Sequence, residues 1–156
     1  MSVEIKQLRG TAIRIARELL ELNQNIQKLE EETSKISRIM TKLDGKEEIE
    51  TKELKPLGLE DMSPLFLKMR LKGLLNIKRE KLTNLQIKKR SCIDALQKIT
   101  LCPACGGQGE IADTKYERID GVIYQDIKVR ACHFCNGTGK IELGDDVMNL
   151  IKRLLN

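Results

Sequence analysis

The sequence predicts a mainly α-helical protein. We expect a long antiparallel coiled-coil hairpin, a small four-cysteine zinc module built on a β-hairpin, and a short C-terminal helix. Apolar residues recur at heptad spacing through the first part of the chain, a second long helical pattern follows, and two cysteine pairs share one internal spacing. Charged residues make up 33% of the chain and aromatic residues 3%, which favours elongated helices over a large globular core.

Residues 1–43 carry the first helical pattern. Its apolar seam alternates steps of four and three residues, and only Thr33 is polar. This series predicts a coiled-coil helix about 60 Å long, at about 1.5 Å per residue, that ends at Asp44-Gly45. The seam positions are Met1, Ile5, Leu8, Ala12, Ile15, Leu19, Leu22, Ile26, Leu29, Thr33, Ile36, Met40 and Leu43.

Residues 45–63 form the expected tip of the hairpin, an acidic and irregular loop. Its acidic side chains are Glu47, Glu48, Glu50, Glu53, Glu60 and Asp61. Ser63-Pro64 then predicts an N-cap followed by proline in the first turn of a second helix, which runs to about Thr100. The seam of this helix is Leu71, Leu75, Lys78, Leu82, Leu85, Lys89, Cys92, Leu96 and Ile99.

The pairing of the two helices stays open at this stage. They can fold back on each other within one chain, with residues 45–63 at the turn. Alternatively, residues 1–43 can pair across a homodimer, and a four-helix bundle would combine the two arrangements. We expect a homo-oligomer.

Two cysteine boxes follow, each reading C-x-x-C-x-G-x-G. The first begins at Cys102 and the second at Cys132. A C-x-x-C turn presents two sulfurs on one side, so two facing turns predict a closed tetrahedral Zn²⁺ site with one ion per chain. The expected ligands are Cys102, Cys105, Cys132 and Cys135, and the glycines that turn backbone N–H groups toward the sulfurs are Gly107, Gly109, Gly137 and Gly139.

Other uses of the cysteines remain as alternatives. A dithiol redox pair needs only one box and prefers a βαβ context, which the pattern lacks. Disulfides persist in secreted proteins, whereas the chain starts without an apolar signal segment. Iron–sulfur ligation is a further alternative. We expect His133 to be an exposed residue rather than a ligand, and Cys92 to be a small buried side chain.

The segment between the boxes predicts a β-hairpin. Asp120-Gly121 favours a two-residue type I′ turn. Folding there pairs Ile119 with Val122 and places opposite charges across the strands on one face, Lys115 with Asp126 and Asp113 with Lys128. The other face carries the mostly apolar set Ala112, Tyr116, Ile123, Ile127 and Val129, which we expect to pack on the C-terminal helix or on a partner.

The boxes resemble the cysteine-rich domain of the DnaJ chaperone family, specifically its inner two repeats, which share one zinc. The likeness covers residues 101–143 and implies the same four ligands, Cys102, Cys105, Cys132 and Cys135. The chain has no J-domain signature, because its one histidine is followed by Phe134, so chaperone ATPase stimulation does not carry over. A weaker likeness to the bacterial regulator anti-TRAP covers the second box and the C-terminal end. The expected domains are residues 1–100, 101–143 and 144–156.

The second helix is strongly basic, since residues 64–100 hold ten Lys and Arg against two acidic residues. These charges either solvate the coiled coil and pair with glutamates of the first helix, or bind nucleic acid. The residues expected to make nucleic-acid or partner contacts are Lys78, Arg79, Lys81, Lys88, Lys89 and Arg90.

We interpret the chain as a non-enzymatic, cytoplasmic adaptor or regulator that acts through protein–protein contact. It shows no catalytic constellation and no apolar run of about 20 residues that could span a membrane. The alternative is a nucleic-acid-binding or RNA-polymerase-associated regulatory factor that uses the basic helix. Its layout is similar to that of the DksA class of RNA-polymerase factors, although glycine-rich boxes are not typical of that class.

Overall fold

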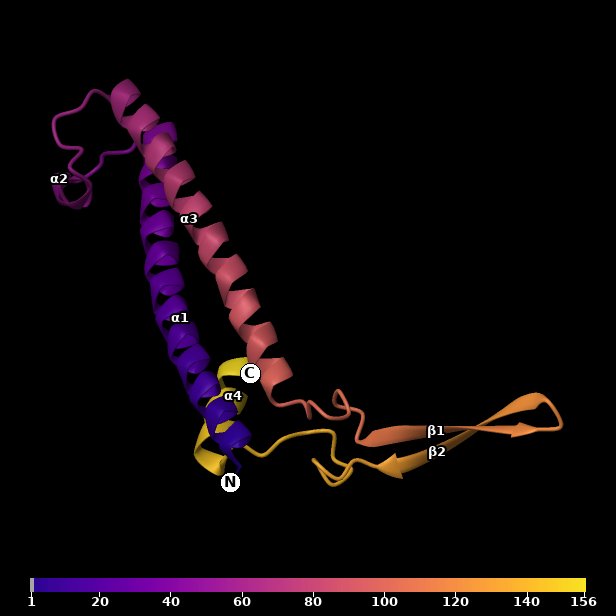
Figure 1. Ribbon diagram of the computed structural model, residues 1–156. Helices are drawn as coiled ribbons and strands as arrows, with labels where there is room; N and C mark the ends of the chain where they lie inside the picture. The colour runs from indigo at the N-terminus through magenta and orange to yellow at the C-terminus, as the bar shows by residue number, and fades with distance from the viewer. Residues whose placement is uncertain (1) are drawn as a thin grey trace. The chain divides into compact units, whose positions relative to one another are not determined.

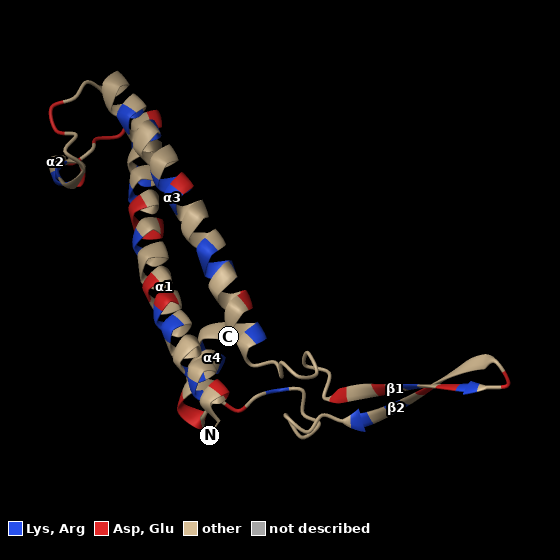
Figure 2. Ribbon diagram, in the orientation of Figure 1, with Lys and Arg blue, Asp and Glu red and all other residues tan. Residues whose placement is uncertain are grey.

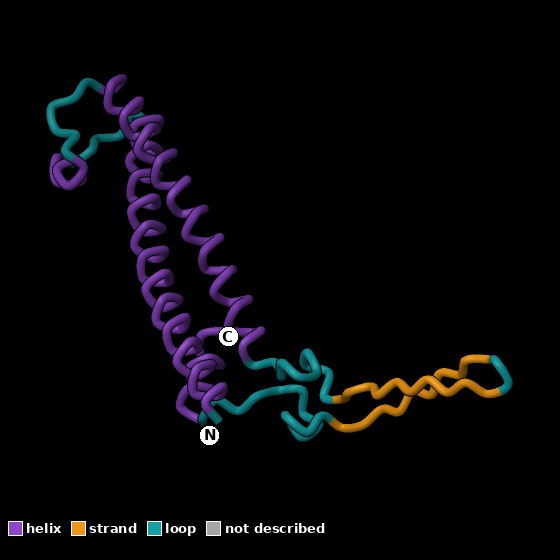
Figure 3. Tube along the Cα trace, viewed as in Figure 1, coloured by secondary structure: helices purple, strands orange, loops and turns teal. Residues whose placement is uncertain are grey.

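The computed structural model describes residues 2–156, so Met1 of the predicted seam lies outside the described residues. The expectation of a mainly α fold with a small β-hairpin is confirmed (Figures 1 and 3). The elements are helices α1 (Val3–Asp44), α2 (Thr51–Leu54), α3 (Pro64–Ile99) and α4 (Asp145–Leu155), the 3₁₀ turn η1 (Lys55–Leu57), and strands β1 (Glu110–Ile119) and β2 (Val122–Ala131).

The chain divides into two compact units. One is Leu19–Ser91, and the other combines the chain before Leu19 with Cys92–Asn156. The division crosses both long helices, so each unit holds a part of α1 and a part of α3. The first is the helical unit (Leu19–Ser91), and the second is the cysteine unit.

In the helical unit, α1 and α3 run antiparallel. Glu32 of α1 accepts a hydrogen bond from the Lys78 ammonium of α3 at 2.5 Å, and Asp44 accepts one from Lys68 at 2.5 Å. Between these two contacts the residue number rises from 32 to 44 along α1 and falls from 78 to 68 along α3, so the helices run in opposite directions. Side chains of both predicted seams, including Leu22 of α1 and Leu71 of α3, are buried here.

The segment between α1 and α3 is more ordered than the irregular loop that the sequence predicts. It forms α2 and η1, and its Leu59 joins the buried cluster of Ile36 and Ile39 from α1 with Leu71 and Leu75 from α3. Apolar residues at intervals within this acidic segment pack against the helices and hold it in place. Partly buried members of the same cluster include Ile49, Leu54, Leu57 and Met62.

The cysteine unit has a separate small core. Ala12 and Ala16 of α1 are fully buried, and so are Leu96 of α3 and Leu143 before α4. The small alanine side chains leave room for neighbouring elements to approach closely. Helix α4 adds Val147 and Ile151, spaced four residues apart on one face, which explains why so short a helix is bound in place.

Strands β1 and β2 form a two-stranded antiparallel ribbon in the predicted register. Ile119 pairs with Val122, Lys115 with Asp126, and Asp113 with Lys128. Asp120 and Gly121 have φ of 51° and 81°, as a type I′ turn requires. The ion pairs differ slightly from the expectation, because Asp113 binds the diagonal neighbour Arg130 at 2.7 Å instead of Lys128.

Within residues 2–156, no helix combines the length and the apolar character needed to cross a lipid bilayer.

Replacing Leu71 by Ala should destabilise the helical unit by about 2–5 kcal/mol, because Leu71 is fully buried in its cluster. Leu65→Ala on the same helix is the matched control, since Leu65 is 69% exposed and its loss should change stability by less than about 0.5 kcal/mol. Urea denaturation, followed by far-UV circular dichroism, measures the change in the free energy of unfolding for both substitutions. Equal effects of the two substitutions would contradict the packing of α3 on this side.

Candidate metal centre

Two short turns of the same construction carry the four cysteines. One joins α3 to β1 and the other joins β2 to α4. Their backbones are linked reciprocally: the N–H of Cys102 donates to the carbonyl of Gly139 at 2.9 Å, and the N–H of Cys132 donates to that of Gly109 at 2.8 Å. Leu101, just before the first box, pairs with Lys140, just after the second. In the same way Ala131, just before the second box, pairs with Glu110, just after the first. The two boxes are therefore related by an approximate two-fold arrangement.

The four cysteine sulfurs gather at the centre of this arrangement. All lie within 4.8 Å of one another, with 3.8 Å between the sulfurs of Cys102 and Cys132 and 3.7 Å between those of Cys105 and Cys135. Four sulfurs at about 2.3 Å from a central Zn²⁺ lie about 3.8 Å apart in a regular tetrahedron. The cluster therefore has the dimensions that a bound metal ion needs. The separations are far from the about 2.05 Å of a disulfide bond.

Backbone N–H groups point at the sulfur of the second cysteine in each box. Gly109 donates to Cys105 Sγ at 3.2 Å, and Gly139 donates to Cys135 Sγ at 3.2 Å. Such hydrogen bonds stabilise a thiolate and orient it toward the metal. This is the role that the sequence predicts for the last glycine of each box.

Glycine is also required sterically at these two positions. A Cβ at Gly139 would overlap the carbonyl oxygen of Gly107, and a Cβ at Gly109 would overlap that of Gly137. Both residues have positive φ, 73° and 80°. The close backbone approach that brings the two cysteine pairs together therefore depends on the missing side chains.

Burial and hydrogen bonding set the protonation of the thiols. Burial raises the pKa of the Cys102 thiol. Burial opposes ionisation at Cys135 as well, but the Gly139 N–H and the neighbouring thiols outweigh it and lower the pKa of Cys135. Four adjacent thiols cannot all lose a proton without a compensating charge, which a divalent cation supplies. The donor set fits a metal ion of the soft, tetrahedral class.

Histidine is not part of the cluster. His133 lies between Cys132 and Cys135 in the sequence and is exposed, as expected. Phe134 beside it is 43% exposed and, with Pro103 of the first box, lines a shallow hollow of about 470 Å³ against the first turns of α1. Cys92, the fifth cysteine, is buried on α3 away from this cluster, also as expected.

An ion pair that the sequence did not predict ties α1 to α4 within the cysteine unit. The Arg9 guanidinium donates to both carboxylate oxygens of Asp146, at 2.7 and 2.5 Å, and to the carbonyl of Leu143 at 2.8 Å. The hydrogen bond from Arg9 lowers the pKa of Asp146 to about 2. Asp146 also lies in the first turn of α4, where a negative charge complements the helix dipole.

The six basic residues predicted for nucleic-acid or partner contact do not form one surface. Lys78 is partly buried and paired with Glu32, and Lys89 lies half-buried in the seam facing α1. The other four are exposed, but at about 100° per residue their positions fall on two flanks of α3. These four are Arg79, Lys81, Lys88 and Arg90. Figure 2 shows the Lys and Arg residues spread along this helix.

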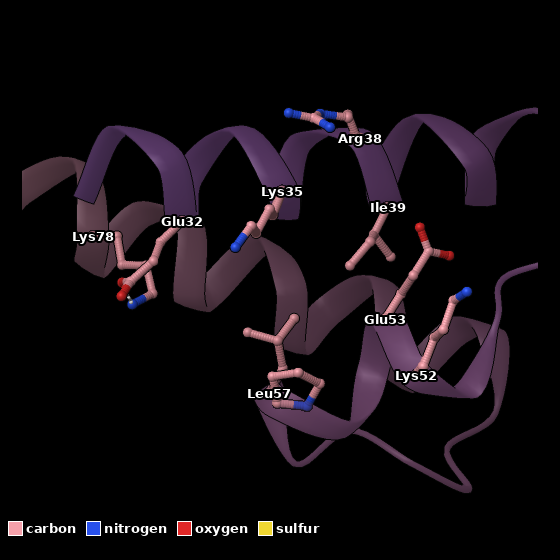
Figure 4. Close-up of a pocket in the computed structure, with 9 residues that line it drawn as sticks. Glu32, Lys35, Arg38, Ile39, Lys52, Glu53, Leu57 and Lys78 are labelled. Carbon is pink, nitrogen blue, oxygen red and sulfur yellow. Dashed lines mark hydrogen bonds and ion pairs between the residues drawn. The ribbon is translucent and has the colours of Figure 1, made fainter. Parts of the chain in front are cut away.

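A cavity of about 590 Å³ in the helical unit is the other concave candidate (Figure 4). Its charged groups are largely paired: Lys78 with Glu32, which lowers the pKa of Glu32, and Lys42 with Glu53 at 2.8 Å. Without thiol or imidazole groups it offers no comparable metal chemistry. Its lining residues are Glu32, Lys35, Arg38, Ile39, Lys52, Glu53, Pro56, Leu57 and Lys78.

Comparisons with known protein families, with curated proteins and with solved structures find no match for this chain. The geometry of the cysteine cluster and of the surrounding surfaces therefore carries the functional argument.

Gly139→Ala should weaken metal binding by about tenfold or more, because its Cβ would force the two boxes apart. Gly106→Ala is the matched control. Gly106 also has positive φ, 62°, but a Cβ there meets no atom within 4 Å. Titration with Co²⁺, followed by the thiolate-to-cobalt absorption bands, measures both. Equal losses in the two variants would contradict the close approach of the boxes.

Arg9→Gln should lower the melting temperature of the metal-bound protein, whereas Arg14→Gln, at an exposed position on the same helix, should not. Asp146 has a folded pKa of about 2 and an unfolded pKa of about 3.9, so its contribution is complete above about pH 4 and is lost as pH falls toward 2. The difference in melting temperature between wild type and Arg9→Gln, measured by calorimetry, should therefore be the same at pH 6 and pH 8. A difference that shrinks between these pH values would contradict the Arg9–Asp146 pairing.

Proposed function

We propose that the protein is a non-enzymatic, zinc-stabilised adaptor that binds another protein through the β1–β2 ribbon. The observation that carries the proposal is the exposed apolar face of this ribbon. Tyr116 is 69% exposed, Ile123 67% and Val129 61%. Solvated apolar side chains collected on one face are typical of protein interaction surfaces.

The metal in this proposal is one structural Zn²⁺ per chain, held by the four box cysteines. An all-cysteine tetrahedron has no open position for a water or a substrate, so the ion stabilises the fold and performs no hydrolysis. The sulfur separations of 3.7 and 3.8 Å and the Gly139 N–H directed at Cys135 support this assignment. The resemblance to the DnaJ cysteine-rich domain points to the same metal.

The metal site also explains how the ribbon can leave its apolar face uncovered. An isolated two-stranded ribbon is only marginally stable in water. Here the hydrogen bond from Cys132 to Gly109 lies next to the first ladder pair, Glu110 with Ala131. The closed cysteine cluster thereby clamps the open end of the ribbon, while Asp120-Gly121 closes the other end. The apolar face is then free to bind a partner instead of stabilising the fold.

The two ribbon faces differ in character, which defines the binding side. Directly opposed residues share a face, so Thr114 lies with the apolar set opposite Ile127, and Arg118 and Gln125 lie on the same face. The opposite face holds the charged pairs and the Arg130–Asp113 ion pair, and its exposed apolar residues, Ile119, Val122 and Tyr124, gather near the turn. At about 3.4 Å per residue, the ten-residue strands present a face about 33 Å long. A partner segment of comparable length can lie along it.

Nucleic-acid binding is the second candidate function, and the exposed basic residues of α3 favour it. Arg79, Lys81, Lys88 and Arg90 form no ion pair within the described residues 2–156. Against it, α3 carries only Phe66 as an aromatic side chain, and stacking on aromatic residues supports much of single-strand binding.

Affinity capture from a lysate of the source organism, with and without nuclease, distinguishes the two functions. We expect a protein partner that is retained after nuclease treatment. The double variant Tyr116→Thr/Ile127→Thr should capture at most about a tenth of the amount of that partner that the wild type captures, because both side chains lie on the apolar face. The double variant Val122→Thr/Tyr124→Thr is the matched control, since it makes similar changes on the opposite face.

Equal zinc content in all three proteins, measured by elemental analysis, establishes that the module is intact. Loss of all partners on nuclease treatment would support the nucleic-acid function instead. Equal loss of the partner in both double variants would refute the assignment of the binding face.

A further inference from the structure

The outward side of α3 in the helical unit carries an exposed apolar stripe. Phe66, Met69 and Ile77 are all more than half exposed, although Leu67, Leu71 and Leu75 on the same helix are buried against α1. The steps from Phe66 to Met69, to Gly73 and to Ile77 are three or four residues, which places these positions on one side of the helix. Ile87, also exposed, continues this side. We define the outer stripe as Phe66, Met69, Gly73, Ile77, Glu80, Asn84 and Ile87.

Gly73 is an unusual member of this stripe. Glycine inside a helix is less favourable than alanine because of the backbone freedom that it loses on folding. A Cβ added at Gly73 meets no atom within 4 Å, so no contact within the chain requires glycine there. Its absent side chain leaves the helix backbone open between Met69 and Ile77, so a large side chain of another molecule can lie against it.

Basic residues border the stripe on both sides. At about 100° per residue, Lys72 and Arg79 fall on one flank of α3, and Arg70 and Lys81 on the other. Among residues 2–156, none of these four forms an ion pair. Figure 2 shows the basic residues distributed along α3. In helix–helix interfaces, an apolar seam with like charges on both flanks pairs with a helix that carries the opposite charges at its own flanking positions.

The composition of the stripe argues against a membrane or a nucleic acid as its occupant. Glu80 lies at the middle of the stripe, directly between the basic flanks, and Asn84 follows it one turn later. A lipid surface would bury the Glu80 carboxylate without a hydrogen-bond donor, which is costly. Phosphate groups would bind the basic flanks but would leave the apolar residues uncovered and would repel Glu80.

A second copy of the chain is also a poor occupant. Pairing two outer stripes would set basic flanks against basic flanks, which is unfavourable. The described part of α1 in the helical unit offers no alternative face, because Leu20 is its one exposed large apolar residue. A different protein therefore fits the stripe better.

We propose that the outer stripe of α3 binds an acidic amphipathic α-helix of another protein. The partner helix presents apolar residues at heptad spacing to Met69 and Ile77, Glu or Asp residues to the basic flanks, and a large side chain to the open position at Gly73. Polar residues of the partner meet Glu80 and Asn84 and select its register, as buried polar positions do in coiled coils. This surface is separate in sequence from the ribbon and does not depend on the proposed function of the ribbon.

A designed pair of peptides tests the proposal on the full, metal-bound chain. Both have about four heptads with the same seam of Leu and Ile, with Asn at the two seam positions that meet Glu80 and Asn84. One peptide has Glu at all flanking positions and the other has Lys. Fluorescence anisotropy should show that the Glu peptide binds at least about 100-fold more tightly than the Lys peptide. The double variant Met69→Asp/Ile77→Asp should lower the affinity for the Glu peptide at least about tenfold with an unchanged circular dichroism spectrum, since both side chains are exposed. Leu20→Asp is the control on α1 and should bind as wild type does.

Gly73→Ala separates binding from stability. It should raise the melting temperature by a few degrees, because alanine is the better helix former and meets no clash. It should also lower the affinity for the Glu peptide by about tenfold, since the added methyl group occupies the space that the partner side chain would take. Gly10→Ala is the matched control, because Gly10 is also an exposed helical glycine and an added Cβ there would meet no atom within 4 Å. It should raise the melting temperature without any change in affinity.

The proposal is overturned if the Lys peptide binds as tightly as the Glu peptide, or if Met69→Asp/Ile77→Asp leaves the affinity unchanged. It is also overturned if the peptides fail to bind while vesicles containing phosphatidylserine, or a DNA duplex, bind in a manner that Met69→Asp/Ile77→Asp abolishes. A dimer in light scattering that Met69→Asp/Ile77→Asp dissolves would assign the stripe to a second copy instead.

Discussion

The approach of the two cysteine boxes to within a backbone contact is the constraint on which the cysteine unit depends. Cys102 donates to Gly139 and Cys132 donates to Gly109, and these reciprocal bonds bring all four sulfurs within 4.8 Å of one another. A divalent cation bound at this spacing would balance the charge of four thiolates. The same bonds set the register of the ribbon, because the first ladder pair, Glu110 with Ala131, follows immediately.

The helical unit is stabilised by a different interaction, apolar burial along one side of each helix. Leu71 and Leu75 of α3 pack with Ile36 and Ile39 of α1, and Leu59 of the connecting segment completes the cluster. Partly exposed ion pairs such as Lys78 with Glu32 contribute little to stability, but they favour the antiparallel alignment of the two helices. Burial on one side of α3 leaves the opposite side exposed, and that side is where the apolar residues without a partner gather.

These two sources of stability allow the chain to expose large apolar surfaces without a large core. The ribbon can expose Tyr116 and Ile123 because its ends are held by the cysteine cluster and by the Asp120-Gly121 turn. Helix α3 can expose Met69 and Ile77 because its other side is packed. In both places the apolar residues that stabilise the fold are separate from those available for binding.

Local patterns in the sequence determined much of this protein. The heptad series located α1 and α3, the identical boxes indicated the four cysteines that gather, and Asp120-Gly121 set the ribbon register. Each depends on spacing between near neighbours, which the chain itself specifies. The tertiary structure alone decided other features. Arg9 and Asp146 meet across 137 positions, so no local periodicity links them.

Segment 45–63 shows the same limit of local patterns. The sequence predicted an acidic and irregular loop, but Leu59 is buried because α1 and α3 together create an apolar surface that neither helix has alone. The heptad spacing had already placed Lys78 and Lys89 in the seam of α3, where both are half-buried. Charge is read from the sequence, but the direction in which a charged side chain points depends on which side of its helix is packed.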